Sequence, residues 1–142
     1  MTIITTADTY SEQLNHDLYV LKKQLSEAHK PNPEQYRRAI TSANNTVICA
    51  KHESRIIGMA VLNKVFTLSS IIGDVDDVVV LDSYRGQGIA RQLLDKIVEI
   101  SEQQGITVLR LTSAPSRVAA NRLYKNYGFK QKDTNSYRLF IK

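Results

Sequence analysis

The chain has 142 residues, of which 42% are hydrophobic and 23% are charged, so it has the length and composition of one globular domain, residues 1–142, with a sizeable core. Its apolar runs are too short to cross a bilayer, and its N-terminus lacks the basic flank and long apolar stretch of a secretion signal. A single cysteine excludes an internal disulfide framework, and together these features lead us to expect a cytoplasmic protein.

The first half of the chain predicts a strand, two helices and three further strands. Thr2–Thr6 is almost entirely β-branched, which favours a strand. From about residue 9 to residue 28, leucines recur every three or four positions, as an amphipathic helix requires. A second helix is expected after Asn32, whose side chain can cap it, with Pro33 at its first position. The three strands are expected at Thr46–His52, at Arg55 to about Val65, and at Ile71–Leu81.

The second half predicts helices and strands in alternation. An apolar stripe of helical period runs from Gly86 to Gln104, and Gly105 is expected to end that helix. The remaining elements are expected to be a strand at Ile106–Leu111, a short helix ended by Gly128, a short optional strand at Phe129–Gln131, and a closing strand at Thr134–Ile141. This order predicts an α+β fold, with a mixed, mostly antiparallel sheet flanked by helices.

Charge is distributed unevenly along the chain. Residues 1–83 contain 8 Lys and Arg and 10 Asp and Glu, whereas residues 84–142 contain 11 and 4, and the total is +5. The basic second part indicates an anionic partner, either a nucleic acid or a small phosphorylated ligand. The sequence contains no nucleic-acid recognition motif and no aromatic platform, so we expect no nucleic-acid partner.

The segment "RGQGIA" (Arg85–Ala90) lies where a predicted strand meets a predicted helix. The first turn of a helix has unpaired backbone N–H groups that can hold a phosphate, and glycines allow close approach of its oxygens. The segment does not match the dinucleotide fingerprint, because the third glycine is missing, and no Gly-Lys-Ser/Thr follows as in phosphate-loop enzymes. The alternative is a glycine-rich turn that only begins a helix.

Two segments resemble the GNAT superfamily of N-acetyltransferases. "VVVLDSYRGQGIARQLL" is similar to the acyl-CoA-binding motif of that family, with Arg85, Gly88 and Ala90 at its defining positions. "AANRLYKNYGF" (Ala119–Phe129) is similar to a second family segment, and a predicted strand lies between the two. The predicted order of elements also resembles the GNAT fold over nearly the whole chain.

The resemblance implies acetyl-CoA as cosubstrate. In the family, the backbone of the strand before the glycine turn pairs with the pantetheine arm in a gap beside a β-bulge. A backbone N–H near Val78 would polarise the thioester carbonyl and stabilise the tetrahedral oxyanion. The residues implied to bind acetyl-CoA are Val78, Val79, Val80, Arg85, Gly86, Gln87, Gly88, Ile89, Ala90 and Asn121.

The resemblance also implies the groups that move protons. Tyr124 matches the tyrosine that protonates the departing thiolate, although a buried core tyrosine is the alternative reading. Some relatives have a glutamate base where this chain has Thr112, so that base is absent here. "GDVDDVVV" resembles a segment of glucosamine-6-phosphate N-acetyltransferases and puts Asp76 in the place of its glutamate. Asp76 and Asp77 point to opposite faces of a regular strand, and a proton relay through water without any base is the other option.

Other residues depart from the family pattern or have no role in it. Arg117 stands where many members have an asparagine, and the nearby Asn121 is the candidate to replace that contact. Cys49 lies in a predicted strand and is expected to be a buried, inert thiol. The three histidines have no metal-ligand spacing, so no metal site is expected.

The sequence therefore predicts an N-acetyltransferase that moves the acetyl group of acetyl-CoA to a primary amine of a small molecule or peptide by direct attack. The acceptor is expected to meet the first helix, the segment "AHKPNPEQ" and the strand near Phe66, and Asp74, Asp76 and Asp77 hint at a cationic amine. A non-catalytic CoA-binding module of the same fold is the alternative, because Thr112 replaces the glutamate. A homodimer is expected because symmetric dimers are the commonest oligomers.

Overall fold

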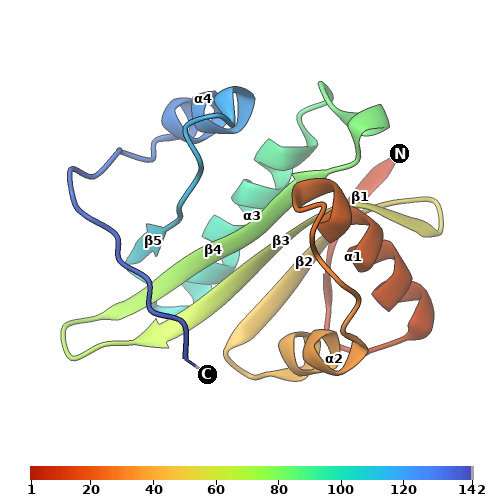
Figure 1. The fold of residues 1–142 in the computed structure, drawn as a ribbon, viewed down its shortest axis with the longest axis horizontal. Coiled ribbons are helices and arrows are strands. Elements are labelled where there is room, and N and C mark those ends of the chain that lie inside the picture. Colours follow the sequence, from red (N-terminus) through yellow and green to blue (C-terminus); the bar gives the residue numbers. More distant parts are fainter. Residues whose placement is uncertain (142) are drawn as a thin grey trace. The chain divides into compact units, whose positions relative to one another are not determined.

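The computed structural model describes residues 1–141, which form two compact units, the first ending at Thr112 and the second beginning at Ser113. The first unit contains a sheet, a short 3₁₀ helix and three α-helices, and the second contains one helix (Figure 1). The elements are β1 (Thr2–Ala7), α1 (Glu12–Leu25), α2 (Pro33–Thr41), β2 (Asn45–His52), β3 (Arg55–Phe66), β4 (Ile71–Val80), η1 (Asp82–Tyr84), α3 (Ile89–Gln104), β5 (Val108–Arg110) and α4 (Val118–Tyr127).

The sheet has five strands in the order β1-β2-β3-β4-β5, so each strand lies beside its neighbour in the sequence. The first three pairings are antiparallel, and β5 pairs with β4 in parallel after the crossover through α3. Helices α1 and α2 lie on one face of the sheet and α3 lies on the other (Figure 1). This architecture confirms the predicted α+β class and the mostly antiparallel, mixed sheet.

Capping side chains determine where the first two helices begin. The Ser11 hydroxyl accepts a hydrogen bond from the Leu14 N–H at 3.1 Å, so α1 begins at Glu12, later than its leucine pattern predicted. Asn32 accepts from the Gln35 N–H at 3.1 Å and Pro33 is the first helical residue, as predicted. Helix α1 ends at Leu25, earlier than its leucine pattern predicted, since a periodic pattern alone does not show where the end of a helix frays.

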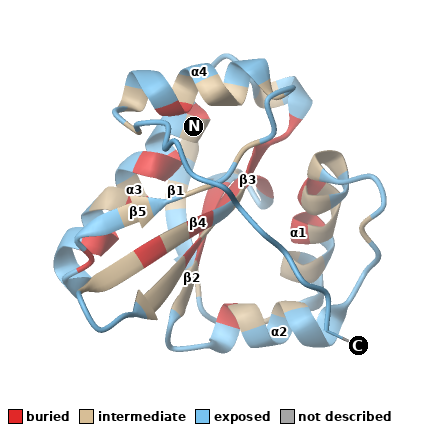
Figure 2. Cartoon of the chain, turned by 60° about the vertical axis from the view of Figure 1, so that its left-hand side comes forward, coloured by how far each residue is buried: buried red, intermediate tan, exposed pale blue. Residues whose placement is uncertain are grey.

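The core of the first unit lies between the central strands and the inner faces of α1 and α3. Figure 2 shows the buried residues on the strands and on the helix faces turned towards them. Each of these side chains was removed from water on folding, which supplies most of the driving force for the fold. The largest fully buried side chains are Leu21, Ile48, Cys49, Ile57, Leu62, Leu93, Leu94 and Ile97.

A buried carboxylate joins α1 to the sheet. Asp17 is 6% exposed, and it accepts hydrogen bonds from the Ile56 N–H at 3.2 Å and from the Gln13 amide at 3.0 Å. Asp17→Ala would leave the Ile56 N–H buried without a partner, so the free energy of unfolding should fall by about 1–3 kcal/mol. Urea denaturation measures this loss. Asp17→Asn keeps an acceptor oxygen and should lose less, whereas an equal loss in both variants would contradict the assigned bond.

The last two predicted strands are wrong. In the second unit α4 ends at Gly128, as predicted, but residues 129–141 form neither the short strand at Phe129–Gln131 nor the closing strand at Thr134–Ile141. Alternating apolar and polar residues favour a strand, but a strand also needs a ladder partner, and within the described residues this segment has none. Its apolar side chains at Tyr137, Leu139, Phe140 and Ile141 are consequently more than three-quarters exposed, at 80–88%.

Candidate functional site

A β-bulge interrupts the pairing of β3 with β4. Met59 pairs with Val79 and Val61 pairs with Asp76, so Ala60 alone stands opposite the two residues Asp77 and Val78. Asp77 has a φ of 54°, the left-handed conformation that side chains other than glycine rarely adopt. A bulge of this kind bends the strand and redirects the side chains around it. The bulge therefore includes Val78, the first of the three valines that the acyl-CoA motif singles out.

The strand β4 is paired with β5 over only part of its length. The parallel ladder joins Ile72–Asp74 to Val108–Arg110 and ends there, because β5 is shorter than the predicted strand. Beyond Asp74, β4 is paired with β3 on one side, apart from the bulge, and on its other side it has no strand partner among residues 1–141. Val78, Val79 and Val80 lie on this open stretch, and their side chains are buried. An extended ligand that added to this edge would pair with their backbone rather than with their side chains.

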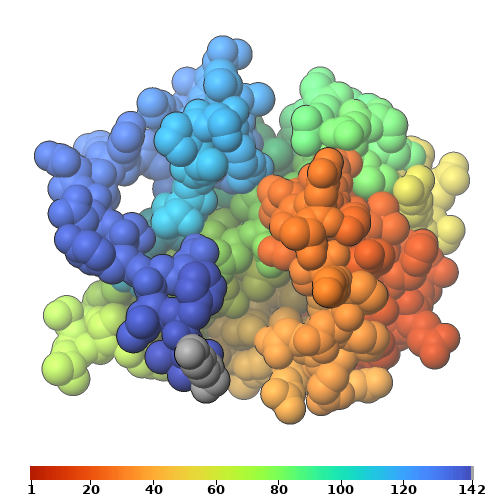
Figure 3. Space-filling model, in the orientation of Figure 1, coloured from red at the N-terminus to blue at the C-terminus, as the bar shows by residue number. Residues whose placement is uncertain are grey.

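The turn after β4 is exposed and ends in a helix N-terminus without a side-chain cap (Figure 3). Gly86 and Gly88 have φ values of 78° and 76°, which explains why glycine stands at both positions. A Cβ built on either would meet no atom within 4 Å, so packing does not require these glycines. The first turn of α3 contains no acidic residue that would repel an anion, and the first N–H groups of a helix, which have no partner within it, can bind a phosphate.

The residues of this turn therefore fit the diphosphate of acetyl-CoA. Gln87, Ile89 and Ala90 complete the row of backbone donors that begins at Gly86, and Ile89 also anchors the turn with its buried side chain. Arg85 is exposed and forms an ion pair with Asp82 at 3.2 Å. An exposed pair of this kind costs little to open, so the guanidinium can turn to an anionic ligand.

Gly88→Ala should weaken the binding of acetyl-CoA by about tenfold or more, because the left-handed conformation is strained for alanine and the added methyl group occupies the approach to the N–H groups. Isothermal titration calorimetry measures this change. Gly105→Ala is the matched control, since Gly105 has a φ of 73° at the other end of the same helix. Equal weakening in both variants would show that only the stability of α3 had changed.

A glutamine of α1 ties this turn to the rest of the first unit. The Gln24 amide nitrogen donates to the Val80 carbonyl oxygen at 2.8 Å, and its oxygen accepts from the Asp82 N–H at 3.1 Å. One side chain thus bonds to the main chain on both sides of Leu81, where β4 ends and η1 begins. Sequence reasoning gave Gln24 no role, because its spacing carries no motif.

Asp76 is the accessible carboxylate beside the bulge. Its side chain is exposed, and it accepts a hydrogen bond from the Asn63 amide at 2.6 Å. Partial burial, followed by the negative charges of Asp77 and Asp74, raises the pKa of Asp76 above its ordinary value of 3.8, while Asn63 and Lys22 oppose the rise. A carboxylate with a raised pKa is a stronger proton acceptor than an ordinary one.

The two neighbouring aspartates have cationic partners. Arg110 donates to both oxygens of Asp74, at 2.9 and 3.2 Å, and Lys22 of α1 forms an ion pair with Asp77. Among residues 1–141, no ion pair is formed by Asp76. The acidic cluster is therefore largely neutralised, which removes most of the hint of a cationic acceptor and leaves Asp76 as the carboxylate available for chemistry.

Aromatic side chains from α1, the following loop and α2 gather near Asp77. His29 shares a hydrogen bond with the Tyr36 hydroxyl at 2.7 Å, and its ring also lies 6.0 Å from that of Tyr19. Burial, with a contribution from Asp77, raises the pKa of Tyr36 to about 12, and burial lowers the pKa of His29. This cluster joins two segments that the sequence assigned to the acceptor, the first helix and "AHKPNPEQ".

The second unit contains the proposed proton donor. Tyr124 on α4 is 6% exposed, and its ring meets that of Phe129 edge to face at 5.9 Å. Burial raises the pKa of Tyr124, whereas the charge of Arg117 and a hydrogen bond from it lower that pKa. Arg117, which departs from the family pattern, thus acts on the Tyr124 hydroxyl and opposes the effect of burial on its pKa.

Asn121 and Cys49 are two further residues that the sequence singled out. The Asn121 amide donates to the Ala114 carbonyl oxygen at 3.0 Å, which ties α4 to the loop before it. Cys49 is buried in β2, as expected, and burial raises the pKa of its thiol to about 12. A thiol with such a pKa is almost never ionised at neutral pH and is a poor nucleophile.

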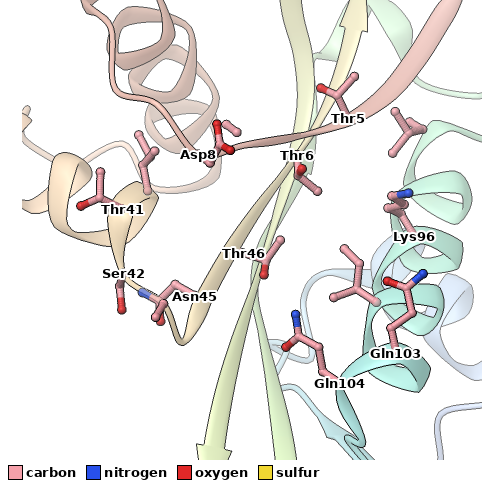
Figure 4. Close-up of a pocket in the computed structure, with 15 residues that line it drawn as sticks. Thr5, Thr6, Asp8, Thr41, Ser42, Asn45, Thr46, Lys96, Gln103 and Gln104 are labelled. Carbon is pink, nitrogen blue, oxygen red and sulfur yellow. The ribbon is translucent and has the colours of Figure 1, made fainter.

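A separate hollow of about 700 Å³ lies in the first unit, lined mainly by hydroxyl and amide side chains from β1, the end of α2, the start of β2 and α3 (Figure 4). Thr5, Thr46 and Gln104 are among its lining residues, whereas the predicted site residues are not. Elsewhere, within residues 1–141, no cluster of His, Cys, Asp or Glu is arranged to hold a metal ion. Every helix of that part of the chain is too short or too polar to cross a bilayer.

Comparison with known proteins identifies a family and several relatives. The model of the acetyltransferase (GNAT) family matches residues 12–129. An aminoalkylphosphonate N-acetyltransferase of Salmonella typhimurium is 34% identical over 84 residues, which cover 58% of this chain and 54% of that protein. An uncharacterised N-acetyltransferase of Mycobacterium tuberculosis is 28% identical over 110 residues, covering 74% of this chain and 65% of that protein. The chain thus spans between about half and two-thirds of the length of these curated relatives.

The fold has close counterparts among solved structures. An aminoglycoside acetyltransferase from an uncultured soil metagenomic sample, solved in complex with sisomicin, superposes with a TM-score of 0.86. The alignment covers 99% of this chain and 97% of that one, at 15% sequence identity. At this identity the likeness establishes the fold and leaves the substrate undetermined.

Proposed function

Because the chain belongs to the GNAT acetyltransferase family, we propose that it transfers the acetyl group of acetyl-CoA to a primary amine by direct attack within a ternary complex. The observation that carries this proposal is the open edge of β4 beside a bulge, followed by a turn with two glycines. A Cβ added to either glycine would meet no atom within 4 Å. The extended pantetheine arm of acetyl-CoA can pair with the open edge, and its diphosphate can bind at the turn that follows.

In this proposal the first unit binds acetyl-CoA and activates the amine. The backbone of Val78–Val80 pairs with the pantetheine arm, and the N–H groups from Gly86 to Ala90 hold the diphosphate. The Val78 N–H donates to the thioester carbonyl oxygen, where negative charge develops as the amine attacks. Asp76 takes the proton that the attacking nitrogen loses. The bound thioester supplies the acetyl group.

The second unit supplies the proton for the leaving group in this proposal. Tyr124 donates its hydroxyl proton to the sulfur of CoA as the carbon–sulfur bond breaks. Arg117 keeps the pKa of this hydroxyl lower than burial alone would set it. We further propose that residues 1–142 act as one domain, which the family match over residues 12–129 supports because it extends across both units.

The acceptor is proposed only as a primary amine of a small molecule or peptide. The aminoalkylphosphonate enzyme named among the relatives makes small amines the first compounds to test. Release of CoA from acetyl-CoA, followed with a thiol reagent, should exceed the background rate for at least one amine in a broad panel. Mass spectrometry should find the acetyl group on that amine. Tight acetyl-CoA binding with no turnover over the whole panel would instead favour the non-catalytic CoA-binding module.

We also propose that the chain forms a homodimer in the cytoplasm, where its single cysteine stays reduced. Strand β1 is at the edge of the sheet, and its six residues, TIITTA, contain no charge that would block pairing with another strand. Sedimentation equilibrium should therefore give about twice the chain mass of 16.0 kDa. A mass that stays at one chain up to high protein concentration would contradict the dimer.

A further inference from the structure

The ion pair between Lys22 and Asp77 is placed at the most unusual backbone position of the sheet. Among the described residues, the non-glycine residues with positive φ are Glu53, in the hairpin turn between β2 and β3, and Asp77, within β4. A turn commonly contains such a residue, but the interior of a strand does not. Something must hold Asp77 in this conformation, because the regular strand conformation is less strained.

Lys22 of α1 provides that support. Its ammonium group pairs with the Asp77 carboxylate, and only 29% and 30% of the two side chains are exposed. This burial separates the pair from the fully solvated pairs of the surface, which contribute little. In a regular strand, Asp77 would point to the face opposite Asp76. The bulge instead brings the Asp77 carboxylate to α1.

The two adjacent carboxylates consequently have different partners. Asp77 has a cation, whereas Asp76 has the neutral amide of Asn63 and stays exposed. We infer that Lys22 is a positioning residue for acetyl transfer, which holds Asp77 in the bulge and so makes Asp76, and not Asp77, the carboxylate that receives the amine proton. This inference rests on the proposed function and gives it a residue in α1 that no family motif marks.

The groups that act on Asp76 come from three elements. Asn63 on β3 donates to it, Asp74 and Asp77 on β4 repel its charge, and Lys22 on α1 attracts it. Arg110 on β5 is bound to Asp74. The charge of Asp77 also acts on His29 in the α1–α2 loop and on Tyr36 of α2. The loss of the Lys22 charge and the loss of the Asp77 charge should therefore shift the pKa of Asp76 in opposite directions.

The test is a titration of the Asp76 carboxyl carbon by ¹³C NMR in the free protein, which needs no acceptor. Lys22→Met should raise the pKa of Asp76, because an attracting cation is lost and Asp77 is left unpaired. Asp77→Asn should lower that pKa, because a repelling charge is lost, and asparagine tolerates the left-handed conformation. In the double variant Lys22→Met/Asp77→Asn, the pKa should return towards that of the unmodified protein. Changes in the same direction, or none, would overturn the inference.

Matched variants separate this role from a structural one. Lys22→Arg keeps the charge and should leave the titration of Asp76 unchanged, so it tests the inference even if Lys22→Met fails to fold. Lys23→Met removes the next lysine of α1, which bonds to the Glu27 carbonyl oxygen rather than to Asp77. It should leave the pKa of Asp76 nearly unchanged. A shift as large as that of Lys22→Met would contradict a specific effect of the Lys22–Asp77 pair.

Turnover provides the second measurement. With an acceptor amine from the panel, Lys22→Met should lower kcat/KM at neutral pH by about tenfold and move the acidic limb of its pH profile upward. Asp77→Asn should move that limb downward. If no amine is acetylated, the proposed function fails, but the NMR titration still decides whether Lys22 sets the charge state of Asp76.

Discussion

Asp76→Asn is expected to lower kcat/KM for acetyl transfer by about 100-fold or more at neutral pH, the usual contribution of a positioned general base. Asparagine has nearly the same size and keeps an oxygen that can accept from the Asn63 amide, so the fold should be unaffected. The loss should appear in turnover and leave acetyl-CoA binding unaltered, as calorimetry would show. Full activity in this variant would show that water or another group, and not Asp76, accepts the proton.

The pH profile provides an independent check on Asp76. Burial and the charges of Asp77 and Asp74 raise its pKa, and only the ionised carboxylate can accept a proton. Activity should therefore fall as the pH drops through this raised pKa, above the ordinary aspartate value of 3.8. Asp74→Asn removes one of the repelling charges and should move the acidic limb to lower pH. A limb that stays in place would show that a different group titrates.

Tyr124→Phe is the second change with a large expected effect. Loss of the hydroxyl removes the proton donor for the thiolate, and kcat should fall by about 100-fold or more. The ring and its edge-to-face contact with Phe129 are kept, so thermal unfolding should change little. Tyr127→Phe on the same helix is the matched control and should retain its activity. Equal rates for both variants would leave Tyr124 as a packing residue.

Replacement of Arg117 should shift the alkaline limb of the pH profile of activity. Tyr124 must be protonated to donate, so activity is lost as the pH rises through its pKa. Arg117 lowers that pKa, and Arg117→Met should therefore move the alkaline limb to higher pH and make the hydroxyl a weaker acid. An unchanged limb would indicate that the tyrosine and the arginine do not interact in solution.

Patterns that depend on nearby residues predicted the fold well. The cap at Asn32, the stop at Gly105 and the apolar stripe of α3 are local in the sequence, and the structure has each of them. The closing strand at Thr134–Ile141 failed because a strand also needs a distant partner, about which alternation carries no information. The bulge at Asp77 is equally non-local, since only the register with β3 reveals it.

The candidate site shows the same division. The glycine turn and Tyr124 have sequence signatures, whereas Lys22, Gln24 and Asn63 are common polar residues at unremarkable spacings. Their partners lie 55, 56 and 13 positions away in the chain, respectively. Without the register of the sheet and the placement of α1, no rule connects them to Asp76 or to the turn.

The two hydrogen bonds of the Gln24 side chain limit which amino acids can replace it. A carboxylate of the same length has no donor for Val80, a lysine has no acceptor for Asp82, and asparagine is one methylene shorter. Substitution there should thus be far less permissive than elsewhere on an amphipathic helix. When homologous sequences are aligned, the presence of glutamine at this position becomes a criterion for recognising members in which the first helix is bonded to the main chain on both sides of the end of β4 in the same way.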